Sequence, residues 1–219
     1  SFNSQKNAAS SPTVSGPRGG APSGNTASSD TSFVRQKYAL VVGIGKFQNA
    51  KVPTLKYAAK DARDFANLLM DPQGGRFYKE NVTVLTDEQA TTRAIRSALA
   101  SIATKAMSDD LVLLYFSTHG SEPAMDRTKS GSGYLITHDT EVEDLLATGF
   151  GMDDLANFIR QKVRAERIVA FLDTCYSGDT ARNLTGAKAL QVLSDESFRQ
   201  VAQGKGTVLI TSSTNNELS

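Results

Sequence analysis

Short apolar runs alternate with amphipathic stretches along this chain from residue 37 onward. Helical spacing, such as that of Ile95, Leu99 and Ile102, indicates helices between the apolar runs. This alternation predicts an α/β fold, with a mostly parallel central sheet and helices on both faces. The predicted strands are 38–45, 81–87, 109–120, 166–175 and 206–213, with a short hairpin arm at 133–139, and the predicted helices are 55–71, 91–107 and 152–163.

Residues 1–36 differ in composition from the rest of the chain. They are rich in Ser, Gly, Ala, Pro and Asn, and they lack the apolar periodicity from which a core could form. We therefore expect a flexible tail or linker at 1–36 and a single domain at 37–219.

Charge and cysteine content exclude several classes of function. The net charge of +1 gives no strong field that would attract nucleic acid or an anionic membrane. No apolar run reaches the roughly 20 residues that cross a bilayer, so we expect a soluble protein whose compartment the sequence does not indicate. A single Cys excludes a disulfide framework within the chain. One Cys and two His are also too few for a four-ligand zinc site, unless carboxylates complete it.

The Gly-Ile-Gly at 43–45 is a partial match to a dinucleotide-binding motif. It follows a predicted strand, but Gln48 stands where that motif requires Gly or Ala. We therefore regard nucleotide binding as disfavoured.

Two predicted strands run into residues that carry chemistry. The strand at 109–120 reaches His119, and the strand at 166–175 reaches Cys175, the single cysteine. Ligands bind at the carboxyl ends of strands in open α/β sheets, and strands joined by a crossover are expected to be neighbours. A thiol nucleophile would then lie beside an imidazole base.

Each of these residues also has a plainer interpretation. A free Cys is often a buried core residue, although Cys175 lies between the polar Asp-Thr and Tyr-Ser-Gly and not inside the apolar run. His119 could be a solvated loop residue. His138, in a polar Thr-His-Asp stretch, is a weaker candidate for the base.

Two glycines fit the catalytic interpretation. Gly120, directly after the histidine, would leave a backbone N–H able to point at a developing oxyanion together with the N–H of Cys175. Gly178 would let the chain turn away after the nucleophile.

These motifs carry a family resemblance. The stretches "FSTHG" and "LDTCYSG" resemble the His-Gly and Asp-x-Cys-x-Ser-Gly signatures of the caspase and metacaspase superfamily of cysteine peptidases. The resemblance implies a caspase-like three-layer sandwich, with His119 as general base and acid and Cys175 as the attacking thiolate. It also implies protein or peptide substrates and hydrolysis through an acyl-enzyme that requires no cofactor.

Two acids indicate which peptide bond would be cut. Asp61 and Asp173 match the metacaspase pocket aspartates, and two carboxylates in one pocket favour Arg or Lys. On a helical wheel Asp61 is expected between Phe65 and Leu68, inside an apolar arc. Alternatively, Asp61 is a surface acid and Asp173 a loop cap. The usual Gly-Cys before the first aspartate is Tyr57-Ala58 here.

The resemblance extends to calcium, maturation and the end of the domain. Asp139, Asp153 and Asp154 resemble part of the calcium set of many metacaspases, but Arg182 falls where a further acid is expected. The polar segment 177–205 is either a site of self-processing or a surface loop containing a helix. A caspase-like domain normally continues through another strand and helices after a stretch like 206–219, so either the chain is a fragment or these elements lie on a separate C-terminal small-subunit fragment, which would be a partner.

Two other functions stay open at this point. The chain could be an inactive caspase-fold module that regulates or binds other proteins, which the intact Cys and His argue against. It could also be another thiol hydrolase, such as a glutaminase-like amidase, for which the paired acids give no reason.

Overall fold

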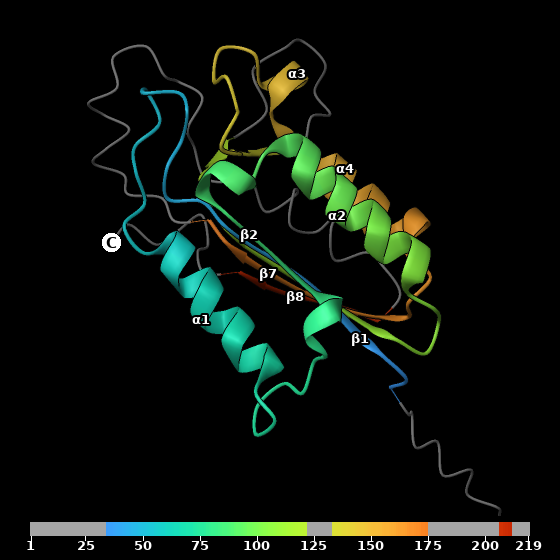
Figure 1. Cartoon of the computed structure of the whole chain (residues 1–219). Coiled ribbons are helices and arrows are strands. Elements are labelled where there is room, and N and C mark those ends of the chain that lie inside the picture. Colours follow the sequence, from blue (N-terminus) through green and yellow to red (C-terminus); the bar gives the residue numbers. More distant parts are fainter. Residues whose placement is uncertain (1–33, 122–132, 175–205, 212–219) are drawn as a thin grey trace, which may run out of the picture. The chain divides into compact units, whose positions relative to one another are not determined.

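The computed structural model describes residues 34–121, 133–174 and 206–211. Within them, five strands form a sheet in the order β2-β1-β3-β7-β8, and every pair of neighbours is parallel (Figure 1). The predicted parallel sheet is confirmed, and so is the predicted adjacency of the third and fourth strands, which are β3 and β7. The strands are β1 (Lys37–Gly43), β2 (Val82–Thr86), β3 (Leu111–Ser117), β7 (Arg167–Asp173) and β8 (Thr207–Thr211).

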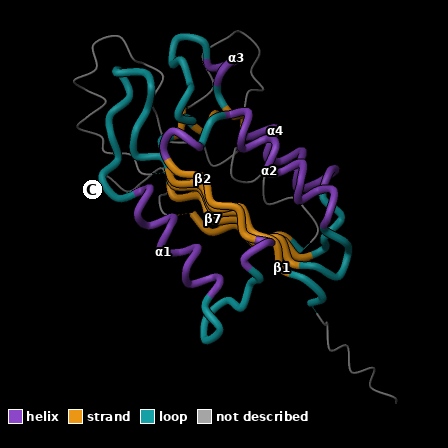
Figure 2. Tube along the Cα trace, in the orientation of Figure 1, coloured by secondary structure: helices purple, strands orange, loops and turns teal. Residues whose placement is uncertain are grey.

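Helices cover both faces of this sheet, which confirms the predicted layers (Figure 2). One face packs against α1 (Ala58–Met70) in a small apolar core. The opposite face packs against α2 (Thr92–Lys105) and α4 (Met152–Asn157) in a larger core, which contains Ile95, Leu99 and Ile102 as predicted. None of the helices in the described ranges has the length and hydropathy needed to cross a membrane.

Two predicted elements differ from the structure. The helix expected at 152–163 is α-helical only to Asn157 and continues as the π-helical segment η3 (Phe158–Lys162), closed by a bond from Val163 N to Phe158 O. This wider turn is compatible with burial of the consecutive Phe158 and Ile159. The arm expected at 133–139 is shorter.

That shorter arm, β5 (Tyr134–Leu135), is the middle strand of a small antiparallel sheet in the order β4-β5-β6. This sheet follows the carboxyl end of β3, and its first strand begins directly after His119. The remaining elements are η1 (Lys79–Asn81), η2 (Asp87–Gln89), β4 (Gly120–Ser121), α3 (Leu145–Thr148) and β6 (Phe150–Gly151).

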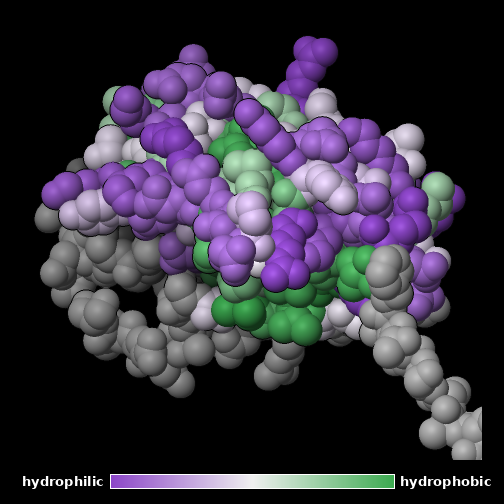
Figure 3. All heavy atoms as spheres, turned by 60° about the horizontal axis from the view of Figure 1, so that its bottom comes forward, coloured by the Kyte–Doolittle hydropathy of each residue, from purple (hydrophilic) through white to green (hydrophobic). Residues whose placement is uncertain are grey.

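Within the described residues, β8 is an edge strand of the large sheet, and it exposes apolar side chains. Val208 and Ile210 are 53% and 46% exposed. The register places them beside Val169 and Phe171 of β7, on the side of the sheet that carries α1. Apolar surface also gathers next to the grey atoms in Figure 3. Within the described residues, this part of the sheet is therefore less covered than the part under α1.

The first turn of α1 lies very close to the end of β1. A Cβ added at Gly43 would lie 2.3 Å from the carbonyl oxygen of Ala58 and 2.5 Å from the Cβ of Ala62. Small residues on both elements permit this approach, because the buried face of α1 consists largely of alanines. Glycine at 43 is thus explained by packing and needs no nucleotide.

Gly43→Ala is expected to lower the free energy of unfolding by about 2–3 kcal/mol, because the added methyl group must displace the backbone of α1. Urea unfolding followed by circular dichroism measures this change. Gly151→Ala is the matched control, since its nearest neighbour would be 3.7 Å away, and it should cost less than about 1 kcal/mol. Equal losses in the two variants would contradict the close contact as the cause.

Candidate active site

Three central strands end at the same level of the sheet. Gly43 of β1 pairs with Ser117 of β3, and Ser117 pairs with Asp173 of β7. The residues that follow these strands therefore meet at one edge, where α/β sheets bind ligands. His119 lies at this edge as expected. Cys175 and Gly178 lie outside the described residues, but Cys175 comes only two positions after the end of β7.

The imidazole of His119 is buried and held by the chain. His119 is only 8% exposed, so it is not a solvated loop residue. The ring Nε2 lies 2.8 Å from the carbonyl oxygen of Pro53, and the ring lies against Phe47 with centroids 5.4 Å apart. A carbonyl oxygen can only accept, so Nε2 donates, and in the neutral ring Nδ1 is the basic nitrogen.

Pro53 and Phe47 belong to the loop 44–57 between β1 and α1, which sequence reasoning did not connect with His119. This loop extends beyond the ends of the strands (Figure 1). A backbone carbonyl acceptor has no characteristic residue type, so no motif could reveal Pro53. An aromatic residue soon after a buried strand is a weak signal at best.

The backbone N–H of Gly120 points away from the small sheet. Ile136 N donates to the carbonyl oxygen of His119 at 2.9 Å, which makes Gly120 and Leu135 a non-hydrogen-bonded pair of the antiparallel ladder. In such a pair the N–H groups are directed away from the partner strand. β4 is the edge strand among the described residues, so this N–H faces outward beside His119.

Asp173 is half-buried at the end of β7. Its Oδ2 accepts a hydrogen bond from Ser117 Oγ at 3.1 Å, and its carbonyl oxygen accepts one from Thr118 N at 3.2 Å. Because side chains alternate along a strand, Asp173 shares a face with Phe171, which contacts Phe65 of α1. The Asp173 carboxylate is therefore on the α1 side of the sheet.

Asp61 lies in the first turn of α1, on this same side, but the expectation of an apolar arc around it is wrong. Asp61 is exposed, and Leu68 is 56% exposed. The close approach of α1 to β1 turns the alanine face of the helix inward and leaves Asp61 and Leu68 on the outer side. No side chain of the described residues forms an ion pair with Asp61.

Asp64, three residues further along α1, is engaged differently. It pairs with Lys60, and this hydrogen bond raises the pKa of the Lys60 ammonium. Within the described part of the chain, Asp64 thus forms an ion pair with a Lys side chain, whereas Asp61 forms none.

His138, the weaker candidate for the base, has a different environment. Its Nδ1 lies 2.8 Å from the carbonyl oxygen of Lys46, so Nδ1 donates to the loop 44–57. Its own carbonyl oxygen accepts from Gln48 N at 2.8 Å. These bonds tie His138 to the loop that supports His119.

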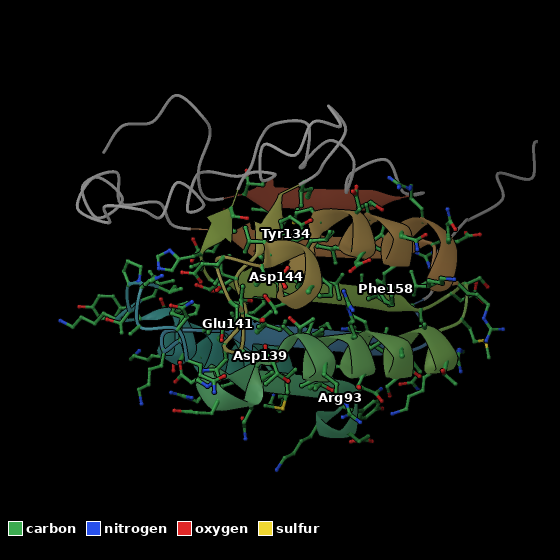
Figure 4. All side chains as sticks on the ribbon, turned by 90° about the horizontal axis from the view of Figure 1, so that it is seen from above. Arg93, Tyr134, Asp139, Glu141, Asp144 and Phe158 are labelled. Atoms are coloured by element: carbon green, nitrogen blue, oxygen red, sulfur yellow. The ribbon has the colours of Figure 1, made fainter. Side chains whose placement is uncertain are left out.

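The three acids considered for calcium are engaged with protein groups. Asp139 accepts from Thr92 N at 2.9 Å, at the start of α2, where Figure 4 shows it. Asp154 pairs with Arg96 at 2.6 Å, and Asp153 lies in the first turn of α4 and also has an interaction with another group. Across the described ranges no three His, Cys, Asp or Glu side chains form a group that could hold a metal ion. As described, these residues do not fit a calcium site.

Comparison with known proteins gives the family. Residues 36–219 match the family described as Caspase domain, which is most of the chain. The chain belongs to this family. It is a caspase-family cysteine peptidase domain, in agreement with the resemblance of the His-Gly and Asp-x-Cys-x-Ser-Gly stretches.

Individual relatives are more distant. Metacaspase-4 of Arabidopsis thaliana is 29% identical over 172 residues, which is 73% of this chain and 38% of that protein. The crystal structure of protein GSU0716 from Geobacter sulfurreducens aligns with a TM-score of 0.51 at 22% identity, over 65% of this chain and 51% of that one. The structure of pro-sf-caspase-1 aligns with a TM-score of 0.43 at 16% identity, covering 64% and 46%. The caspase domain described here thus spans well under two thirds of the first two of these relatives.

Calcium is expected to be dispensable for activity, because no three His, Cys, Asp or Glu side chains of the described residues converge on a place that could hold the ion. Peptidase activity in excess chelator should therefore stay within about threefold of activity in millimolar calcium, because calcium needs six or more oxygen ligands around it. Activation of tenfold or more that is lost in Asp154→Asn would contradict this prediction. Glu166→Gln, an exposed position directly before the amino end of β7, is the control substitution.

Proposed function

We propose that this caspase domain is an endopeptidase that uses Cys175 as nucleophile and His119 as base, and that it cleaves after Arg or Lys. The environment of His119 is the observation that carries this proposal. The imidazole is buried at the carboxyl edge of the sheet, its Nε2 is committed to Pro53, and β7 beside it runs on toward Cys175.

The proposed reaction starts with proton transfer from the thiol of Cys175 to Nδ1 of His119. The thiolate attacks the carbonyl carbon of the scissile bond, and the oxyanion accepts hydrogen bonds from the N–H groups of Gly120 and Cys175. His119 then gives its proton to the leaving amine, which leaves an acyl-enzyme. Water, deprotonated by His119, hydrolyses this thioester and restores the thiol.

The bond to Pro53 supports this sequence of steps. The Pro53 carbonyl fixes the orientation of the ring, and its dipole interacts favourably with the imidazolium that forms when the thiol is deprotonated. The outward N–H of Gly120 supports the oxyanion role, because an N–H already used in the ladder could not serve it.

Asp61 and Asp173 are proposed to bind the basic side chain of the substrate. Both belong to the α1 side of the sheet at its carboxyl edge, Asp173 half-buried on the sheet and Asp61 exposed in the first turn of the helix, so a long basic side chain bound at Asp173 is proposed to meet Asp61 at the mouth of the pocket. Two carboxylates suit a guanidinium better than an ammonium, because Arg can bind them through parallel hydrogen bonds. The same specificity would let the enzyme cut its own segment 177–205, which contains Arg182 and Lys188.

The first prediction of this proposal concerns the dyad and the cleaved residue. Fluorogenic peptides that differ only in the residue before the scissile bond should be hydrolysed when it is Arg or Lys and not when it is Asp. Cys175→Ala and His119→Ala should each lower kcat/KM by about 10³-fold or more. On storage, only the wild type should cleave itself, and intact-mass measurement would then show loss of the full-length chain.

Two outcomes would contradict this proposal. Preferential hydrolysis of the Asp peptide would exclude the basic specificity, and full activity of His119→Ala would exclude the dyad. Thermal unfolding of the two alanine variants is the control, since both should fold like the wild type.

The second prediction concerns the pocket acids. Asp61→Asn and Asp173→Asn should each lower kcat/KM for Arg peptides by about 10–100-fold, because each removes a carboxylate that would pair with the guanidinium. Asp64→Asn is the matched control on the same helix and should change kcat/KM by less than about twofold, since its pair with Lys60 is exposed. Unchanged kinetics in Asp173→Asn would remove that residue from the pocket.

A further inference from the structure

The loop 44–57 presents the Pro53 carbonyl to His119, and the start of this loop is held by Asp87. One carboxylate oxygen, Oδ1 of Asp87, accepts from Gly45 N at 2.8 Å and from Lys46 N at 3.0 Å. Asp87 follows β2, 42 positions away from Gly45 in the chain. Two backbone donors on one carboxylate oxygen define the direction in which the chain leaves β1.

The far end of the loop is attached to the same point. Leu55 N donates to the carbonyl oxygen of Gly45 at 2.9 Å, and a Cβ at Gly45 would lie 2.3 Å from the carbonyl oxygen of Leu55. Gly45 is therefore bonded on one side to Asp87 and on the other to Leu55. Pro53 is only two residues before Leu55, so a shift of Gly45 would move the Pro53 carbonyl.

Further contacts reinforce the loop. His138 binds the carbonyl oxygen of Lys46, and Val52 is buried in a cluster with Ile136. Lys46 is thus held through its N–H by Asp87 and through its carbonyl by His138. Among these contacts, the two hydrogen bonds to Asp87 are those whose acceptor is a carboxylate.

The backbone of Asp87 is in the left-handed region, with φ of +47°. A non-glycine residue rarely adopts this conformation, although Asp and Asn tolerate it better than most. Its carbonyl oxygen also accepts from Ala90 N at 2.8 Å, in the 3-10 segment η2. This conformation is the one in which the carboxylate reaches the two N–H groups of the loop.

We propose that Asp87 is a positioning residue for catalysis: its carboxylate fixes the loop 44–57 so that the Pro53 carbonyl holds His119 with Nδ1 as the basic nitrogen. This inference rests on the proposed function of His119 as base. Asp87 itself does not touch the imidazole, and it acts through Gly45, Leu55 and Pro53.

Two substitutions separate the carboxylate from the strained backbone. Asp87→Asn keeps an Oδ1 acceptor for both N–H groups and tolerates the left-handed conformation. Asp87→Gly adopts this conformation freely but removes the acceptor. Glu88→Gln is the matched control, because Glu88 is the next acid in the chain and is exposed.

Kinetics form the first readout. Asp87→Gly should lower kcat by about 10–100-fold with little change in KM, as expected when a catalytic group is misplaced by about an ångström. Asp87→Asn should stay within about threefold of the wild type, because both hydrogen bonds can still form. Glu88→Gln should be unchanged. Thermal unfolding checks that all three variants are folded at the assay temperature.

The tautomer of His119 is the second readout, and a merely structural role would leave it unchanged. The chain has only 2 His, so histidine-labelled protein gives two sets of imidazole nitrogen signals. In the Cys175→Ala background at alkaline pH, His119 should carry its proton on Nε2 and His138 on Nδ1. Asp87→Gly should convert His119 to a tautomer mixture, and Asp87→Asn should not.

The outcomes distinguish this inference from the proposed function. An unchanged tautomer and kcat in Asp87→Gly would overturn the positioning role. A rise in KM alone would overturn it too, since Asp87 would then affect substrate binding. If His119→Ala is fully active, the proposed function fails whatever Asp87 does.

Discussion

The parallel pairing of β1, β3 and β7 without stagger is the constraint on which the site depends. Because Gly43, Ser117 and Asp173 lie side by side, the residues after each strand share one edge. A shift by one residue in β7 would turn Asp173 to the opposite face and bury Phe171 on the wrong side. β1 and β3 are buried on both faces and contribute to both cores, so the strand pairing that forms the cores also positions the site.

Above this edge, the geometry of His119 is set by backbone groups more than by side chains. The Pro53 carbonyl orients the ring, and the ladder between β4 and β5 directs the N–H of Gly120 outward. Such groups can be supplied by many sequences.

This distinction also explains how much the sequence could predict. The strands, the helical layers and the edge position of His119 follow from apolar periodicity and from the two signature stretches. The apolar arc around Asp61 was predicted wrongly, because a helical wheel counts Leu68 as an inward residue, whereas Leu68 is 56% exposed and α1 is buried through its small residues, such as Ala62 against Gly43. The roles of Pro53, Asp87 and His138 depend on contacts between distant segments, and no local pattern encodes them.

The support for His119 also has a consequence for how the domain would lose activity. The bond from His119 to Pro53 spans 66 positions in the chain, and the bonds from Asp87 span 42 and 41. The loop they hold is partly exposed, whereas β1, β3 and the helices around them are closely packed. Local opening of a surface loop requires less free energy than global unfolding. Mild denaturant or warming should thus inactivate the domain while its sheet is still intact, so the activity of a preparation reports on the loop and not on the fold.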